Sequence, residues 1–277
     1  MTGTEPLPAA TAIEGASGEL LRAVPYATPD GFRPLLADVH LPPVRRPPVV
    51  LFLHGGGWRL GSRTSFCPTW RDWSPSPFAR LVAAGFAVVS ADYRLSGEAV
   101  FPAQLDDVTA AARWIRDRAA DLGVDAERIV VWGESAGGHL AALLGLTATR
   151  EAPGAVVGVV DWYGPNDLSA MPSRGDPDSR EAQLLGAAAS QVPDLARAAS
   201  PVSHVHAAAP PFHLAHGTAD DAVPAEQSRL LADALRAAGR PVDCELVPDA
   251  GHLWRGPVDG ERIFTRALEF AQRVTAR

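Results

Sequence analysis

The chain has 277 residues and a net charge of −7 at pH 7, from 25 basic and 32 acidic side chains. Because no segment concentrates basic residues, we expect no nucleic-acid partner. No segment has the long uninterrupted apolar run of a membrane span, and residues 1–20 lack the pattern of a secretory signal, so we expect no membrane partner and a cytoplasmic location.

The N-terminal part of the chain divides into a tail and a hairpin. Residues 1–18 are rich in Pro, Ala, Thr and Gly, and we predict a flexible tail there, followed by one domain over residues 19–277. Leu20–Ala27 and Pro34–Leu41 have the composition of strands and flank the turn signal Pro29-Asp30-Gly31. We expect them to pair as an antiparallel hairpin.

From Val49 onward, short apolar runs alternate with helical patterns. The runs are Val49–Leu53, Phe86–Ser90, Ile129–Trp132, Val156–Val160, Phe212–Ala215 and Cys244–Val247. Apolar residues spaced by three and four predict helices over about 102–121, after Pro224 and near the C-terminus. The alternation predicts an α/β fold, in which a mostly parallel sheet of about eight strands is covered by helices on both faces.

Two stretches fit neither strand nor helix of this pattern. Residues 61–77 contain Trp70, Trp73 and repeated prolines, and residues 165–201 contain short helix-like pieces. Long irregular stretches in compact folds are commonly functional. We therefore predict two small lid-like insertions in the domain.

The pentapeptide Gly133-Glu134-Ser135-Ala136-Gly137 stands between an apolar run and a helix-forming stretch. A strand, a sharp turn of small residues and a helix place a serine hydroxyl where a base and an anion-stabilising pocket can reach it together. Ser135 is therefore the predicted nucleophile. The alternative is a glycine-rich turn with an incidental serine, which this position in an alternating chain disfavours.

The second motif, His54-Gly55-Gly56-Gly57-Trp58, follows the run Val49–Leu53. Consecutive glycines let backbone N–H groups approach a substrate and stabilise the anion that forms in acyl transfer. We predict that the N–H groups of Gly56 and Gly57, together with that of Ala136, form an oxyanion hole, and that His54 anchors the loop. The alternative is a turn that only permits close packing.

Among the eight histidines, His252 is the predicted base. It follows the run Cys244–Val247, and a loop at the carboxyl end of a parallel strand reaches the same sheet edge as Ser135. His139 lies four residues after Ser135, but we expect it in the body of the helix, packed and hydrogen-bonded. No histidine shows metal-ligand spacing, so we expect no metal and no cofactor.

A base of this kind needs a carboxylate to hold its tautomer. Asp220 and Asp221 both follow the run Phe212–Ala215 and compete for that role. We choose Asp220, keep Asp221 as the fallback, and keep Asp167 as a more distant alternative. The resulting chain order of serine, aspartate and histidine is the one expected of an α/β-hydrolase.

These motifs resemble those of the α/β-hydrolase esterases of the hormone-sensitive-lipase-like group, in particular the BD-FAE-like bacterial carboxylesterases. The matching segments, between about residues 48 and 255, are His54–Trp58, Asp92–Ala99, Phe101–Ala103, Trp132–Ala141, Trp162–Pro165, Ala199–Pro201, His216–Pro224 and Gly251–His252. The resemblance implies the α/β-hydrolase fold and supports Ser135, Asp220 and His252 as a catalytic triad. The longer stretch 61–77 departs from the family pattern.

Together, the motifs and the resemblance predict an enzyme that hydrolyses a small-molecule carboxylic ester with a short to medium acyl chain through an acyl-enzyme. Trp58, Glu134, Trp162 and Trp254 adjoin the predicted site loops, and we expect them to line the substrate pocket. One alternative is an amidohydrolase of the kynurenine formamidase type with the same triad. Another is a non-catalytic ligand-binding protein that retains the fold. The sequence predicts no particular oligomeric state.

Overall fold

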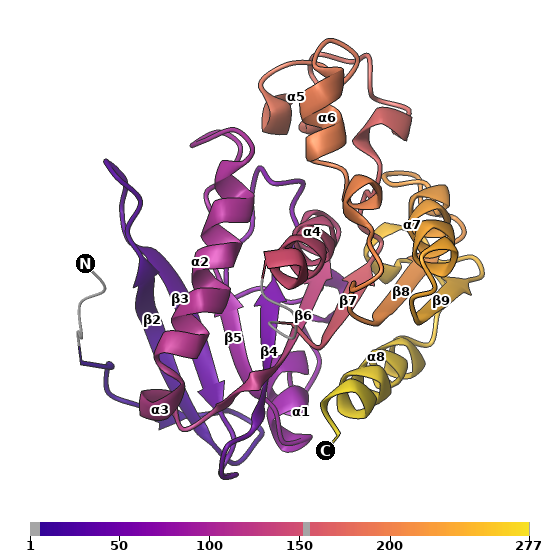
Figure 1. Cartoon of the computed structure of the whole chain (residues 1–277). Coiled ribbons are helices and arrows are strands. Elements are labelled where there is room, and N and C mark those ends of the chain that lie inside the picture. The colour runs from indigo at the N-terminus through magenta and orange to yellow at the C-terminus, as the bar shows by residue number, and fades with distance from the viewer. Residues whose placement is uncertain (1–5, 152–155, 277) are drawn as a thin grey trace.

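The computed structural model describes residues 6–151 and 156–276. Its centre is a sheet with the strand order β1-β2-β3-β5-β4-β6-β7-β8-β9 (Figure 1). The strands are β1 (Thr11–Ala12), β2 (Glu19–Ala27), β3 (Leu35–Leu41), β4 (Pro48–Leu53), β5 (Ala87–Ala91), β6 (Asp125–Glu134), β7 (Gly158–Trp162), β8 (Phe212–Gly217) and β9 (Val242–Val247). All pairs from β5 to β9 in this order are parallel, whereas β1, β2 and β3 pair antiparallel. The predicted mostly parallel sheet with an N-terminal hairpin is confirmed.

The N-terminal prediction needs one correction. Residues 11 and 12, which fall inside the predicted tail 1–18, pair with Leu20 and Glu19 of β2 and add a ninth strand to the sheet. A two-residue strand carries too little periodicity to be recognised in a sequence. Residues 1–5 of the predicted tail lie outside the described residues.

Helices cover both faces of the sheet (Figure 1). They are α1 (Pro77–Ala83), α2 (Ala103–Asp117), α3 (Ala119–Leu122), α4 (Ala136–Glu151), α5 (Arg180–Leu185), α6 (Pro193–Ala198), α7 (Glu226–Ala237) and α8 (Gly260–Thr275), with short 3₁₀ helices η1 (Pro68–Trp70), η2 (Leu168–Ala170), η3 (Pro201–His204) and η4 (His252–Trp254). The helix predicted over 102–121 is divided, because the backbone leaves helical geometry at Arg118 (φ −102°, ψ 10°). Within residues 6–151 and 156–276, no helix is long and apolar enough to cross a membrane.

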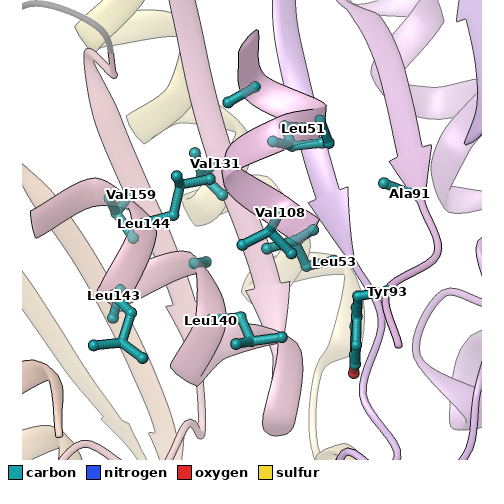
Figure 2. Close-up of a cluster of buried hydrophobic side chains, with 14 of the residues drawn as sticks. Leu51, Leu53, Ala91, Tyr93, Val108, Val131, Leu140, Leu143, Leu144 and Val159 are labelled. Carbon is teal, nitrogen blue, oxygen red and sulfur yellow. The ribbon is translucent and has the colours of Figure 1, made fainter. Parts of the chain in front are cut away.

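The core consists of two apolar layers, one on each face of the sheet. In β4, Val49, Leu51 and Leu53 join the layer beneath α2, α4 and α7, whereas Val50 and Phe52 join the layer formed with α1 and α8. This alternation follows from the two-residue period of a strand. Figure 2 shows part of the first layer, where side chains of β4, β6 and β7 meet those of α2 and α4. A strand buried on both faces explains the continuous apolar runs of the sequence.

The register of the parallel strands aligns their carboxyl ends. Leu53 of β4 lies beside Gly133 of β6, and the row continues through the neighbours of these strands to Asp161, Leu214 and Cys244. The segments that follow β4, β6, β7, β8 and β9 therefore all leave the sheet at one edge. Three of the predicted site segments follow β4, β8 and β9, and Ser135 directly follows β6.

The two irregular stretches occupy different places. Residues 165–201 form η2, α5 and α6, and α5 and α6 stand above the layers at the top of Figure 1. Residues 61–77 contain η1, which packs against η4 beyond the end of β9. Each stretch thus lies near one of the loops that follow the strands.

We predict that shortening a side chain in the centre of the sheet destabilises the protein. Val131→Ala in β6 removes two buried methyl groups at a fully buried position, and should lower the free energy of unfolding by about 2 kcal/mol. Urea denaturation monitored by circular dichroism measures this change. The matched control Val44→Ala, at an exposed position, should stay within about 0.5 kcal/mol of the wild type. Equal effects of the two substitutions would contradict the assigned core.

Candidate active site

Ser135 occupies a strained turn between β6 and α4. Its φ of 52° lies in the left-handed region, which is unfavourable for a residue with a Cβ atom. The turn closes only because its neighbours are glycines: a Cβ atom on Gly133 would collide with the carbonyl oxygen of Gly137. The Ser135 N–H donates to Trp162 O of β7 (2.8 Å), and the Ser135 carbonyl accepts from His139 N (2.9 Å). The hydroxyl is thereby fixed at the first turn of α4.

His252 reaches this hydroxyl from the far end of the sheet. Its Nε2 lies 3.0 Å from Ser135 Oγ, and its Nδ1 lies 2.7 Å from Asp220 Oδ2. With Nδ1 protonated and donating to the carboxylate, Nε2 is free to accept the serine proton. The three side chains form one continuous chain of hydrogen bonds.

Asp220, not Asp221, faces the histidine. The other oxygen of Asp220, Oδ1, accepts from the N–H groups of Ala222 and Val223 (both 2.9 Å), which fixes the carboxylate in the loop after β8. Burial raises the pKa of Asp220, but hydrogen bonds from His216 and His252 outweigh it and hold that pKa well below its usual range. Asp221 is exposed. Asp167 instead caps η2 by accepting from the N–H groups of Ser169 and Ala170.

The glycine loop after β4 lies directly beside Ser135. Gly56 (φ 119°) and Gly57 (φ 61°) both adopt backbone angles that favour glycine, and Gly57 and Ala136 line the same cavity as Ser135. His54 anchors the loop: its Nδ1 lies 2.7 Å from Gly55 O, and its carbonyl accepts from the Tyr93 hydroxyl (2.9 Å). Burial lowers the pKa of His54, which favours the neutral form of its ring.

His139 stays in the helix, as expected. Its Nε2 lies 2.7 Å from Ala199 O, and its Nδ1 accepts from the indole N–H of Trp58 at 3.3 Å. Because burial lowers the pKa of His139 to about 4, the ring is neutral at pH 7 and can accept this bond. The bond fixes the side chain of Trp58, which lines the same cavity as Ser135.

A cavity of about 310 Å³ opens onto Ser135, and its lining combines polar and charged residues with apolar ones. The lining residues are Gly57, Trp58, Arg59, Ser135, Ala136, Pro165, Ser173, Asp176, Asp178, Ser179, Arg180, Glu181, Ala222 and Val223. Residues 173–181 belong to the stretch before and at the start of α5, so the insertion 165–201 forms one wall of the cavity. A molecule that fills this space meets hydroxyl, guanidinium and carboxylate groups beside Ser135.

Sequence reasoning missed the charged residues of this wall. Arg180 packs its side chain against Gly57, so closely that a Cβ atom on the glycine would collide with it. Arg59 donates to the carbonyl oxygens of Asp178 (2.9 Å) and Ser179 (2.7 Å), and so joins the glycine loop to the insertion. The only sequence signal for these residues is that they lie in or beside segments that fit no core element.

The predicted pocket residues need correction. Of the four, only Trp58 lines the cavity at Ser135. Trp162 is fully buried in the sheet, where it contacts Trp132 with ring centroids 5.0 Å apart. Trp254 is buried against Trp162 and lines a separate hollow on the side of residues 69–73. Apolar side chains next to a site loop can fill the core as readily as the pocket, and here two of the three tryptophans fill the core.

Glu134 lies behind Ser135 and not in its cavity. Its carboxylate accepts from the Tyr163 hydroxyl (2.8 Å) and from the N–H of Gly55, so it joins β6 to the glycine loop. The ring of Tyr163 in turn packs on His252, with ring centroids 4.9 Å apart. Burial raises the pKa of Glu134, although these hydrogen bonds oppose the shift. Glu134 thus supports the segments around the serine from inside the protein.

The described residues contain no group of three or more His, Cys, Asp or Glu side chains arranged to hold a metal ion. A hydroxyl bonded to an imidazole, which is itself bonded to a buried carboxylate, is suited to nucleophilic acyl transfer.

Comparison with known proteins places this geometry in a family. The BD-FAE family model matches residues 37–235. Esterase LipQ of Mycobacterium tuberculosis is 36% identical over 247 residues, which cover 83% of this chain and 56% of LipQ. Esterase LipC of the same organism is 35% identical over 223 residues, which cover 76% of this chain and 54% of LipC. The chain thus spans about half the length of these curated relatives.

Solved structures give the same assignment. A truncated carbohydrate esterase from gut microbiota superposes with a TM-score of 0.81 at 28% identity, covering 97% of this chain and all of that one. An esterase from the planctomycete Thermogutta terrifontis with bound propionate gives a TM-score of 0.70 at 29% identity, covering 94% and 93% of the two chains. The predicted α/β-hydrolase fold is confirmed.

Glu134→Gln should stabilise the protein relative to the wild type increasingly as pH rises. Because burial raises the folded-state pKa above the ordinary value of 4.5, the acid favours the folded state at low pH, and this contribution is lost as pH rises through the folded pKa. The amide has no such dependence, so the difference in unfolding free energy, mutant minus wild type, should grow above pH 4.5. Urea denaturation at a series of pH values measures it.

The control for that experiment is Glu19→Gln, which removes a carboxylate from an exposed position in β2. Its difference from the wild type should stay constant over the same pH range. A constant or shrinking difference for Glu134→Gln would show that the carboxyl is not destabilised by its burial.

Proposed function

This chain belongs to the BD-FAE family, and on that premise we propose that it is a serine hydrolase that cleaves carboxylic esters. The observation that carries the proposal is the unbroken chain from Ser135 Oγ through His252 to Asp220, with distances of 3.0 and 2.7 Å, beside an open cavity. The names of the relatives support the same reaction, since LipQ and LipC are esterases. They favour an ester over a formamide as the bond cleaved.

In the proposed mechanism, Ser135 Oγ attacks the ester carbonyl carbon while His252 Nε2 takes the hydroxyl proton. The carbonyl oxygen becomes an anion, which the N–H groups of Gly56, Gly57 and Ala136 stabilise. His252 then returns the proton to the leaving alkoxide, and an acyl-serine remains. Water attacks the acyl-serine with His252 again as the base, which releases the acid and restores Ser135. Asp220 holds His252 in the required tautomer throughout.

The cavity supports a substrate with a short to medium acyl chain and a polar partner. Its volume of about 310 Å³ is at the small end of the range for ligand pockets, and Arg59, Arg180 and Glu181 contribute charge to its wall. Two structurally similar proteins support the two parts of this proposal. The Thermogutta terrifontis esterase has bound propionate, which supports a short acyl chain, and the gut-microbiota protein is a carbohydrate esterase, which supports a polar alcohol. We propose that the substrates are esters of a small carboxylic acid with an alcohol that carries further hydroxyl groups.

Ser135→Ala should abolish hydrolysis of p-nitrophenyl acetate and butyrate, because no other group replaces the nucleophile. It should also abolish covalent labelling by a fluorophosphonate probe, which an intact serine–histidine pair attacks. The control Ser65→Ala, at an exposed position, should keep both. Absence of labelling in the wild type would favour a non-catalytic binding protein. A strong preference for N-formylkynurenine over the esters would favour the formamidase alternative.

Asp220→Asn and Asp221→Asn form a matched pair. An amide at position 220 can donate to Nδ1 and so favours the tautomer in which Nε2 carries the proton, which should lower kcat by about 10⁴-fold. Asp221 is exposed, and its substitution should leave kcat unchanged. Steady-state kinetics with a p-nitrophenyl ester compare the two. A larger loss at position 221 would reverse the assignment.

A further inference from the structure

The stretch 61–77, for which the proposed mechanism has no use, is bonded to the loop that carries His252. The hydroxyl of Thr69 in η1 donates to the carbonyl oxygen of Leu253, the residue after His252, at 2.6 Å. Cys67 Sγ lies 3.6 Å from the same oxygen. These contacts join the insertion 61–77 to the residue next to the proposed base.

The backbone at this point is strained. Leu253 (φ 61°, ψ 28°) and Trp254 (φ 57°) are consecutive non-glycine residues in the left-handed region. L-residues disfavour this region, and two in succession persist only where surrounding contacts enforce the conformation. The direction in which His252 projects therefore depends on what holds residues 253 and 254.

The loop is held from two sides. On the inner side, the Trp254 ring packs on Tyr163 and Trp162, with ring centroids 4.8 and 5.7 Å apart. On the outer side, the hydrogen bond from Thr69 fixes the Leu253 carbonyl. The apolar contact restrains a side chain, whereas the hydrogen bond restrains the orientation of the peptide unit itself.

Thr69 is itself on a rigid support. The next residue, Trp70, is buried and packs on Trp162 and Phe264, with ring centroids 5.1 and 6.3 Å apart. Trp73 stacks on Trp70 at 4.4 Å. The tryptophans of the insertion thus anchor η1 to the core, and η1 presents the Thr69 hydroxyl to the loop.

We propose that Thr69 is a positioning residue for the base: it holds the strained Leu253 peptide so that His252 Nε2 stays in hydrogen-bonding distance of Ser135 Oγ. This inference rests on the proposed function, because it assigns His252 as the base. It assigns to the insertion 61–77 a role in catalysis that is exerted from outside the cavity at Ser135.

Thr69→Val tests the proposal, because valine keeps the shape of threonine and replaces its hydroxyl with a methyl group. A misplaced base slows the chemistry and not substrate binding, so kcat for p-nitrophenyl butyrate should fall about 10-fold while KM stays within about 2-fold. The rate of fluorophosphonate labelling should fall in parallel. Thr69 is exposed and its hydroxyl lies outside the apolar core, so the melting temperature should change little.

Two companion variants complete the test. Thr69→Ser restores the hydroxyl and should recover most of the lost kcat. Thr64→Val makes the same change within the same stretch and is the control. In the described residues the Thr64 hydroxyl bonds only to the Ser62 hydroxyl and not to the loop of His252, so kcat should be unchanged.

The proposal is overturned if Thr69→Val has wild-type kcat. It is also overturned if kcat and the melting temperature fall while KM rises, and Thr69→Ser does not restore them. Failure of the proposed function is a separate outcome, because Ser135→Ala would then keep its activity. A wild-type kcat in Thr69→Val beside an inactive Ser135→Ala would reject the positioning residue alone.

Discussion

The hydrogen bond between Ser135 and His252 joins residues 117 positions apart in the chain, and the arrangement of the sheet makes it possible. Ser135 follows β6 and His252 follows β9, with β7 and β8 between these strands. Asp220 follows β8 and so enters from between the two. Because a one-residue slip turns every side chain of a strand to the other face, the two buried layers fix the register on which this bond depends.

Backbone strain is concentrated where the sheet edge meets the site. The non-glycine residues with positive φ in this region are Trp58, Ser135, Tyr163, Asp249, Leu253 and Trp254. Each costs free energy that contacts elsewhere must offset. Here the offset comes from the core below: Trp58 bonds to His139, Tyr163 bonds to Glu134, and Trp254 packs on Trp162. His139, Glu134 and Trp162 thus support the geometry of the site from outside the cavity.

The sequence predicted those features that short-range rules determine. The turn at Ser135 and the glycine loop each have a local pattern, and alternation of strands and helices places both at one sheet edge, as the structure has them. Asp220 and Asp221 could not be separated by such rules, because both occupy the same loop and the bond between Asp220 Oδ2 and His252 Nδ1 shows which one faces the histidine. The residues that line the pocket could not be predicted, because a large apolar side chain such as Trp162 or Trp254 is equally suited to the core and to a pocket wall.

The sheet edge and the insertions supply different parts of the site. All three members of the proposed triad and the glycine loop follow strands of the sheet, whereas the charged wall of the cavity comes largely from residues 173–181 of one insertion. The other insertion contacts the loop of His252 from outside the cavity. Substitutions in the wall can therefore change which of the proposed ester substrates fits while the distances among Ser135, His252 and Asp220 stay the same. The stretch 61–77 lacks this independence, because it is bonded to the residue beside the proposed base, and under the proposed mechanism changes there act on the rate of the chemical step.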